Sequence, residues 1–162
     1  MSKLELSSRP RRNRKSPAIR GLVRETTISA SNFIYPLFIH DGDDDQPIDS
    51  MPGCKRWSLD GLLGEVREAH DLGVNAVVLF PAIANDLKTP GAEEAWNPDG
   101  LVPRAIRALK KEIPDVAVVT DVALDPYNSD GHDGLVTEDG RILNDETVAV
   151  SYTHLRAHET AQ

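Results

Sequence analysis

The sequence of 162 residues has almost none of the features that mark disulfide-built or membrane-spanning proteins. It contains one cysteine, Cys54, so no internal disulfide can form. No apolar run approaches the roughly 20 residues that a membrane helix needs, and the N-terminus lacks the apolar core of a signal peptide. With 40% hydrophobic and 27% charged residues, the composition is that of a globular protein. We therefore expect a protein of the reducing cytoplasm that has no membrane partner.

Basic residues are concentrated at the N-terminus. The net charge is −8, yet residues 1–24 carry eight lysines and arginines against one acidic residue, Glu5. Such an arm can bind nucleic acid through phosphate contacts, or it can dock on the acidic surface of a sister subunit. We favour docking, because an early proline and apolar residues at helical spacing predict a short amphipathic helix: Pro17, Ile19, Leu22 and Val23. Residues 1–31 are therefore predicted to be a basic arm for homo-oligomer contacts, with no nucleic-acid partner.

Strand and helix patterns alternate through the middle of the chain. Strands are predicted at residues 33–39, 76–80 and 116–124, and amphipathic helices at residues 59–72 and 101–111. The strand at 76–80 is apolar throughout, which is typical of a parallel strand buried on both faces. This order of elements predicts α/β architecture with a parallel sheet and right-handed crossovers.

The stretch after the third strand is rich in glycine, aspartate and asparagine. Residues 134–143 predict a small hairpin around Asp139-Gly140. Residues 144–147 are typical of a helix start, with Asn144 as the N-cap and acidic residues in the first turn. The pattern after this start does not predict a continued helix.

Four segments, in order along the chain, resemble the porphobilinogen synthase family. They are residues 9–20 (RPRRNRKSPAIR), 51–53 (MPG), 94–102 (EAWNPDGLV) and 121–134 (DVALDPYNSDGHDG). The resemblance implies a TIM (β/α)8 barrel that assembles into a large homo-oligomer, with the arm wrapped around a neighbouring subunit. Such a barrel takes about 250 residues. We therefore expect residues 32–149 to form an incomplete barrel of about three βα units.

The same resemblance points to candidate site residues at the carboxyl end of the third strand. In the zinc-using branch of the family, three cysteines occupy the positions that here are Ala123, Asp125 and Asp133. Zinc is therefore not expected, and the chain resembles the aspartate-rich, magnesium-responsive branch. Asp121, Asp125 and Asp133 are expected to line the active site. They would orient the amino group of the substrate 5-aminolevulinate, or Asp125 and Asp133 would hold Mg²⁺ or another hydrated cation.

Other interpretations of these residues stay open at this point. Asp125-Pro126 and Asp133-Gly134 are also good turn formers. His132, inside the same loop, is either a proton shuttle or a hydrogen-bonded loop residue.

The family's covalent chemistry depends on two Schiff-base lysines that belong to the second half of the barrel, so neither is expected in this chain. The lysines present are predicted to lie on the arm, in loops or at a helix end: Lys3, Lys15, Lys55, Lys88, Lys110 and Lys111. The main ligand of the family's allosteric magnesium is also expected in the missing half. The resemblance therefore implies a fragment of a lyase that condenses two 5-aminolevulinates to porphobilinogen in haem biosynthesis, itself inactive. The alternative is a non-catalytic truncated subunit that docks on full-length partners through its arm.

Residues 150–162 depart from the family pattern and resemble one reading frame of a sequencing adapter. We interpret them as a non-native tail, with a natural divergent terminus as the alternative. His154 and His158, four residues apart, would share a helix face, but this origin argues against a metal site there. A sheet that cannot close would expose an apolar edge, which predicts a poorly soluble or molten chain.

Overall fold

The computed structural model describes residues 10–161, and residues 1–9, with the predicted arm residue Lys3, lie outside the described part. Five strands form one sheet in the order β2-β3-β1-β4-β5. Their bounds are β1 Ile34–His40, β2 Gln46–Pro47, β3 Lys55–Trp57, β4 Ala76–Ala82 and β5 Ala117–Thr120. The strands β3, β1, β4 and β5 are parallel, and only β2 runs antiparallel to its neighbour. The predicted parallel α/β sheet is confirmed.

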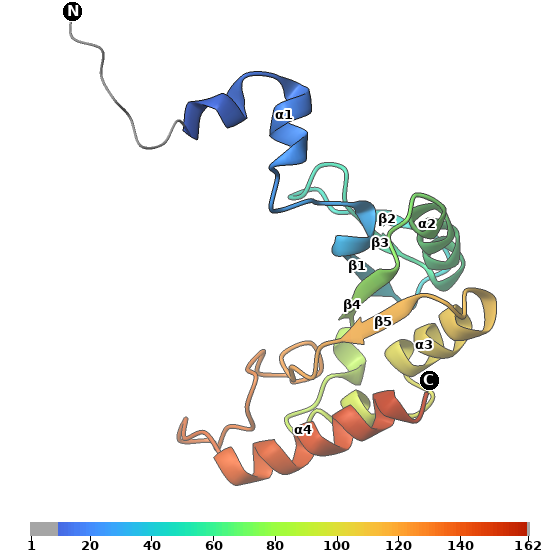
Figure 1. Cartoon of the computed structure of the whole chain (residues 1–162). Coiled ribbons are helices and arrows are strands. Elements are labelled where there is room, and N and C mark those ends of the chain that lie inside the picture. Colours follow the sequence, from blue (N-terminus) through green and yellow to red (C-terminus); the bar gives the residue numbers. More distant parts are fainter. Residues whose placement is uncertain (1–9, 162) are drawn as a thin grey trace, which may run out of the picture.

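Helices α2 (Leu59–Asp71) and α3 (Leu101–Glu112) cover one face of this sheet (Figure 1). Apolar residues at helical spacing on α2 and α3 meet alternate residues of β1 and β4 in one buried core. Its fully buried side chains include Leu37, Ile39, Leu62, Val66, Val77, Leu79, Ile106 and Leu109. The hydrophobic effect therefore holds the two crossover units together on the helix side.

The opposite face of the sheet carries no helix in the described part of the chain. Phe38 of β1 pairs with Phe80 of β4 on this face, and their ring centroids lie 5.9 Å apart. Val119 of β5 is 41% exposed. The strand at 76–80 has the apolar pattern of a strand buried on both faces, but in this incomplete barrel only its helix side is covered.

The start of α2 is set by two polar side chains. Ser58 accepts a hydrogen bond from the backbone N–H of Gly61, as an N-cap residue does. Asp45 in turn accepts from both the backbone N–H and the hydroxyl of Ser58. At the other end of α2, Gly73 has a φ of 91°, the left-handed conformation that lets the chain turn into β4.

The arm contains one short helix, as the sequence predicts. Helix α1 spans Pro17–Leu22, and the Ser16 side chain accepts from the backbone N–H of Ile19. It projects away from the sheet (Figure 1). Its apolar side chains remain exposed, with Leu22 at 82%.

Several local predictions were wrong. The third strand is shorter than expected, because the chain leaves the sheet after Thr120. Strands β2 and β3, which contain a proline or charged residues, were not predicted. The predicted hairpin is reduced to a single bridge between Val136 and Ile142.

The largest correction concerns the last helix, which was not expected to continue. Helix α4 spans Asn144–Glu159 without a break at residue 150. Its N-cap is Leu143 and not Asn144, although Asp145 and Glu146 do lie in the first turn. The non-native origin of residues 150–162 stays a prediction. Within residues 10–161, no helix has the length and apolar character needed to cross a bilayer.

Helix α4 presents polar side chains to the protein. His154 and His158 are almost fully buried, whereas Val148, Tyr152 and Leu155 are exposed. His158 Nδ1 lies 2.9 Å from Thr120 Oγ1, and its Nε2 lies 3.1 Å from His154 Nε2. The Nδ1 of His154 is buried without a hydrogen-bond partner. Such a face is the reverse of the apolar stripe that a surface helix normally buries.

Candidate active site

The candidate site lies where β5 ends and its loop begins. Asp121 follows the last strand residue directly, and its Oδ1 accepts from the backbone N–H of Ala123 at 3.0 Å. The chain then makes one tight turn, in which the Leu124 carbonyl accepts from the N–H groups of Tyr127 and Asn128, each at 2.9 Å. We call residues 121–134 the carboxylate loop. Carboxyl ends of parallel strands are where barrel proteins place their reactive groups.

Asp125 and Asp133 meet in this loop although eight positions separate them. Burial, a hydrogen bond to Asp133, and the charges of Asp133 and Asp121 together raise the pKa of Asp125 above its ordinary value. The negative charge of Asp133 so close by makes the ionised form of Asp125 less favourable. The three aspartates expected from the sequence are thus gathered in one electrostatic cluster.

A cavity of about 350 Å³ opens beside Asp121 and Asp125, whereas Asp133 is not among its lining residues. One wall is polar, formed by Asp121 and Asp125, and the other is aromatic, formed by Phe38 and Phe80. Sequence reasoning missed this aromatic wall. Both phenylalanines occupy the same register position of paired strands, so the signal was present only in the pairing of β1 with β4.

Tyr127 and His132 have structural contacts. Tyr127 is buried, and burial together with the Glu94 and Asp121 charges raises the pKa of its phenol. His132 Nδ1 accepts from the backbone N–H of Gly134 at 2.9 Å, which favours the hydrogen-bonded loop interpretation of this histidine.

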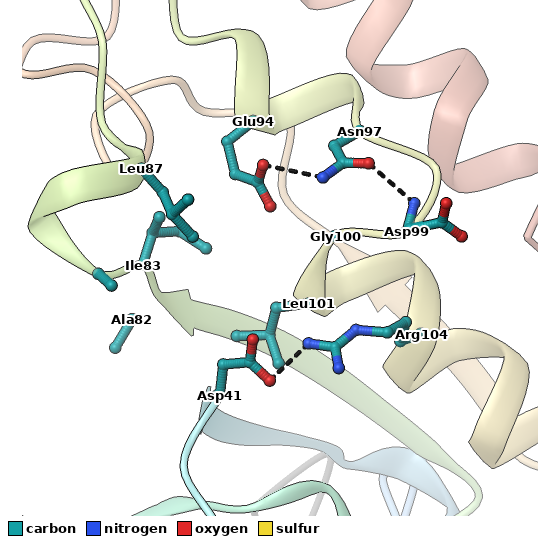
Figure 2. A pocket seen from close by; sticks show the side chains of 11 residues that line it. Asp41, Ala82, Ile83, Leu87, Glu94, Asn97, Asp99, Gly100, Leu101 and Arg104 are labelled. Atoms are coloured by element: carbon teal, nitrogen blue, oxygen red, sulfur yellow. Dashed lines mark hydrogen bonds and ion pairs between the residues drawn. The ribbon is translucent and has the colours of Figure 1, made fainter.

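A second cavity, of about 450 Å³, lies at the carboxyl ends of β1 and β4 beside the start of α3 (Figure 2). Its polar side chains bind one another. Arg104 donates to Asp41 at 2.5 Å, and Asn97 bridges Glu94 and the backbone N–H of Asp99. This cavity is larger than the carboxylate cavity, but none of the three predicted aspartates lines it.

The carboxylate loop offers few side chains that could hold a metal ion. Among residues 10–161, no group of three or more His, Cys, Asp or Glu side chains is placed to hold a metal ion. Asp125 and Asp133 alone fit a hydrated Mg²⁺, which commonly binds through one or two carboxylates and keeps its waters. The pair offers no thiolate or imidazole, which zinc prefers.

The lysines of the described chain lie elsewhere, and none of them lines the carboxylate cavity. Lys55 stands over the Trp57 ring at 4.8 Å, and Lys110 donates to the Val116 carbonyl at 2.7 Å.

The parallel strands, the outer helices and the polar loop at the carboxyl ends define a (β/α) barrel type of protein, of which these residues build the first units. The family model for delta-aminolevulinic acid dehydratase matches residues 7–161, and the chain belongs to this family. A crystal structure of the Toxoplasma gondii ME49 enzyme, also called porphobilinogen synthase, in complex with the reaction product porphobilinogen superposes with a TM-score of 0.94. That comparison has 51% sequence identity and covers 98% of this chain and 46% of the Toxoplasma chain. The predicted family and incomplete barrel are confirmed.

Curated relatives give the same family and correct one prediction. The chain is 63% identical to a chloroplastic delta-aminolevulinic acid dehydratase of Selaginella martensii and 62% identical to that of Glycine max, each over 147 residues. These matches cover 90% of this chain but 35% of each relative, so the chain spans about a third of their length. Because these relatives are named as chloroplastic, the expected cytoplasmic location is wrong.

Proposed function

We propose that this chain is the N-terminal part of a porphobilinogen synthase, a lyase that condenses two 5-aminolevulinates to porphobilinogen with loss of water. The observation that carries the proposal is the carboxylate cluster of Asp121, Asp125 and Asp133 at the carboxyl end of β5, in a chain of the dehydratase family. By itself the chain is inactive, because the Schiff-base lysines that the family requires are not among its residues.

The carboxylates act on the substrate amino group. A substrate ammonium in the cavity donates charge-assisted hydrogen bonds to the cluster, which orients the molecule against the aromatic wall. The raised pKa of Asp125 favours its protonated form, so this carboxyl group can exchange a proton when the amine changes its ionisation. Phe38 and Phe80 exclude water from one side, which strengthens these interactions.

Magnesium is the cofactor that we propose, mainly at an allosteric site in the half of the enzyme that this chain does not span. Mg²⁺ supplies charge neutralisation when bound. Within this chain, Asp125 and Asp133 are the residues that would hold it as a hydrated ion. Their oxygen donors support this assignment.

The arm is proposed to join subunits into a homo-oligomer. Leu22, Val23 and Ile28 are exposed apolar side chains, and they lie beside the arginines of residues 11–24. Burial of these side chains on a second subunit would stabilise the assembly, while the arginines face an acidic surface. The same contacts would let an inactive short chain dock on full-length subunits.

The test uses a restored enzyme, in which residues 1–149 are fused to the C-terminal part of the Glycine max relative. We expect it to form porphobilinogen without zinc and to gain activity with Mg²⁺. Asp125→Asn should lower kcat/KM by about 100-fold, since a misplaced substrate loses that much rate. Asp130→Asn, in the same loop but outside the cluster, is the control. A strict requirement for zinc would contradict the branch assignment, and an inactive restored enzyme would contradict the function.

A further inference from the structure

Asn128 is a buried polar residue at the base of the carboxylate loop. Its side chain is 1% exposed and does not line the carboxylate cavity. The Oδ1 atom accepts from the backbone N–H of Asp130 at 2.6 Å, and the Nδ2 atom donates to the carbonyl of Pro90 at 3.3 Å. One amide group therefore holds its own loop and a second loop, which follows β4.

Backbone contacts reinforce this connection between the two loops. Thr89 and Asn128 form an isolated parallel bridge, in which the Thr89 N–H donates to the Tyr127 carbonyl and the Ser129 N–H donates to the Thr89 carbonyl, at 3.2 and 3.1 Å. The parallel pairing of the sheet thus continues beyond the ends of β4 and β5, into residues 89–90 and 127–129.

The loop after β4 is itself held in one conformation. Ala92 has a φ of 56° and is completely buried, and its N–H donates to the Thr89 carbonyl. Left-handed backbone is uncommon for a residue with a side chain, and it persists where the surrounding structure determines it. Here the Ala92 side chain packs with Ala95, Leu124 and Tyr127 in a separate apolar cluster. The loop can therefore serve as a fixed anchor for Asn128.

The tight turn transmits this anchoring to the site. Leu124 and Tyr127 belong to the apolar cluster, and Asp125, between them in the chain, lines the cavity together with Tyr127. Asn128 closes the same turn through its own N–H, which donates to the Leu124 carbonyl. A shift of Asn128 would therefore move Asp125 relative to Asp133.

We propose that Asn128 is a positioning residue for the synthase reaction: by bonding Pro90 across the two loops, it sets the place of Asp125 in the carboxylate cluster. This assignment rests on the proposed function. The residue acts through Asp125 and does not touch substrate.

The activity test compares substitutions at Asn128 with matched substitutions at its neighbour in the restored enzyme. Asn128→Ala removes both side-chain bonds. Asn128→Asp fills the same space and keeps the acceptor for Asp130, but it loses the donor to Pro90. Ser129→Ala and Ser129→Asp are the controls, because Ser129 is exposed and joins the bridge only through its backbone.

We expect both Asn128 variants to lower kcat at least tenfold while KM changes less than threefold. The Ser129 variants should stay within threefold of the parent. A loss of folded protein with unchanged kcat per folded site would overturn the proposal. So would an Asn128→Asp variant as active as the parent, because the bond to Pro90 would then be dispensable.

Amide hydrogen exchange gives a readout that does not depend on activity. Exchange at Ser129 and Asp130 should be at least tenfold faster in Asn128→Ala than in the parent. Unchanged exchange would show that Asn128 does not hold the two loops together, even if the parent were inactive. An inactive parent with the expected exchange difference would instead contradict the proposed function, and the role of Asn128 in holding the two loops would remain supported.

Discussion

Single residues set the electrostatics of the carboxylate loop. Asp125 is drawn toward the neutral state by burial and by two neighbouring carboxylates, whereas Asp121 bonds the Ala123 N–H and lies next to the sheet. Environments that separate the pKa values of neighbouring carboxyl groups allow one of them to carry a proton while another stays charged. Three aspartates of the same type can therefore have different roles.

Asp133→Asn tests this arrangement. Removing the Asp133 carboxylate takes away a charge and a hydrogen bond that raise the pKa of Asp125, so this pKa should fall toward its ordinary value. In the restored enzyme, the acid limb of the kcat/KM profile should move to lower pH, whatever the loss in rate. The profile of Asp130→Asn should match the parent. An unmoved limb in Asp133→Asn would show that Asp133 does not raise the pKa of Asp125.

At the scale of elements, the acidic loop before α2 helps to cap the N-terminus of this helix. Asp45 belongs to an acidic stretch, residues 41–45, and its carboxylate holds Ser58, the N-cap of α2. The arrangement also explains Gly61, because a Cβ there would lie 2.0 Å from Asp45 Oδ1.

Ser58→Ala should destabilise α2. Loss of an N-cap costs about 1 kcal/mol, which corresponds to roughly fivefold faster amide exchange in the first turns of the helix. Exchange measured by mass spectrometry on the restored enzyme checks this, with the exposed Ser50→Ala as the control. Equal exchange in both variants would show that Asp45 caps the helix without Ser58.

Helix α4 of the 162-residue chain should be destabilised in acid. Burial and the neighbouring His154 lower the pKa of His158 from 6.5 to about 4, and burial also lowers the pKa of His154, which Asp121 partly offsets. Between pH 6.5 and about 4 the unfolded histidines bind protons that the folded ones do not, so stability falls as the pH falls through this range and is constant above it. Thr120 and Tyr127, which face the pair, are uncharged, and the Asp121 charge offsets the lowered pKa of His154 only in part.

Helical circular dichroism between pH 7.5 and 4 measures this loss. The double variant His154→Leu/His158→Leu should be more stable and should lose the pH dependence, because leucine suits a buried helix face. A parent chain whose helicity stays constant over this range would contradict the burial of the two histidines.

The open sheet limits the solubility and the stability of the whole molecule. Strand β5 lies at the edge, and the aromatic face of β1 and β4 has no covering layer in the described residues. Exposed edges and apolar faces promote association. We expect the 162-residue chain to bind an apolar dye and to melt without a cooperative transition. Fusion to the missing barrel units should abolish both properties. A soluble monomer with a sharp thermal transition would contradict this expectation.

Much of the fold could be predicted from local sequence signals. The core strands, α1, α2 and α3 follow from apolar spacing, from Ser16 and from Gly73, because these signals act within a few residues. The family followed from four short motifs. The continuation of α4 could not be predicted in this way, because its buried face is made of histidines and its apolar side chains point to solvent.

The sequence by itself determined the core strands β1, β4 and β5, the helices α1, α2 and α3, the family and which aspartates are candidates for the site. Only the tertiary structure decided which residues meet. Phe38 faces Phe80 because β1 and β4 pair in one register, Asp125 meets Asp133 because the loop turns back, and Asn128 reaches Pro90 because two loops lie side by side. These contacts join positions between 8 and 42 residues apart, which follows directly from their numbering. The free energy of such contacts depends on chain packing, and no local pattern of residues encodes it.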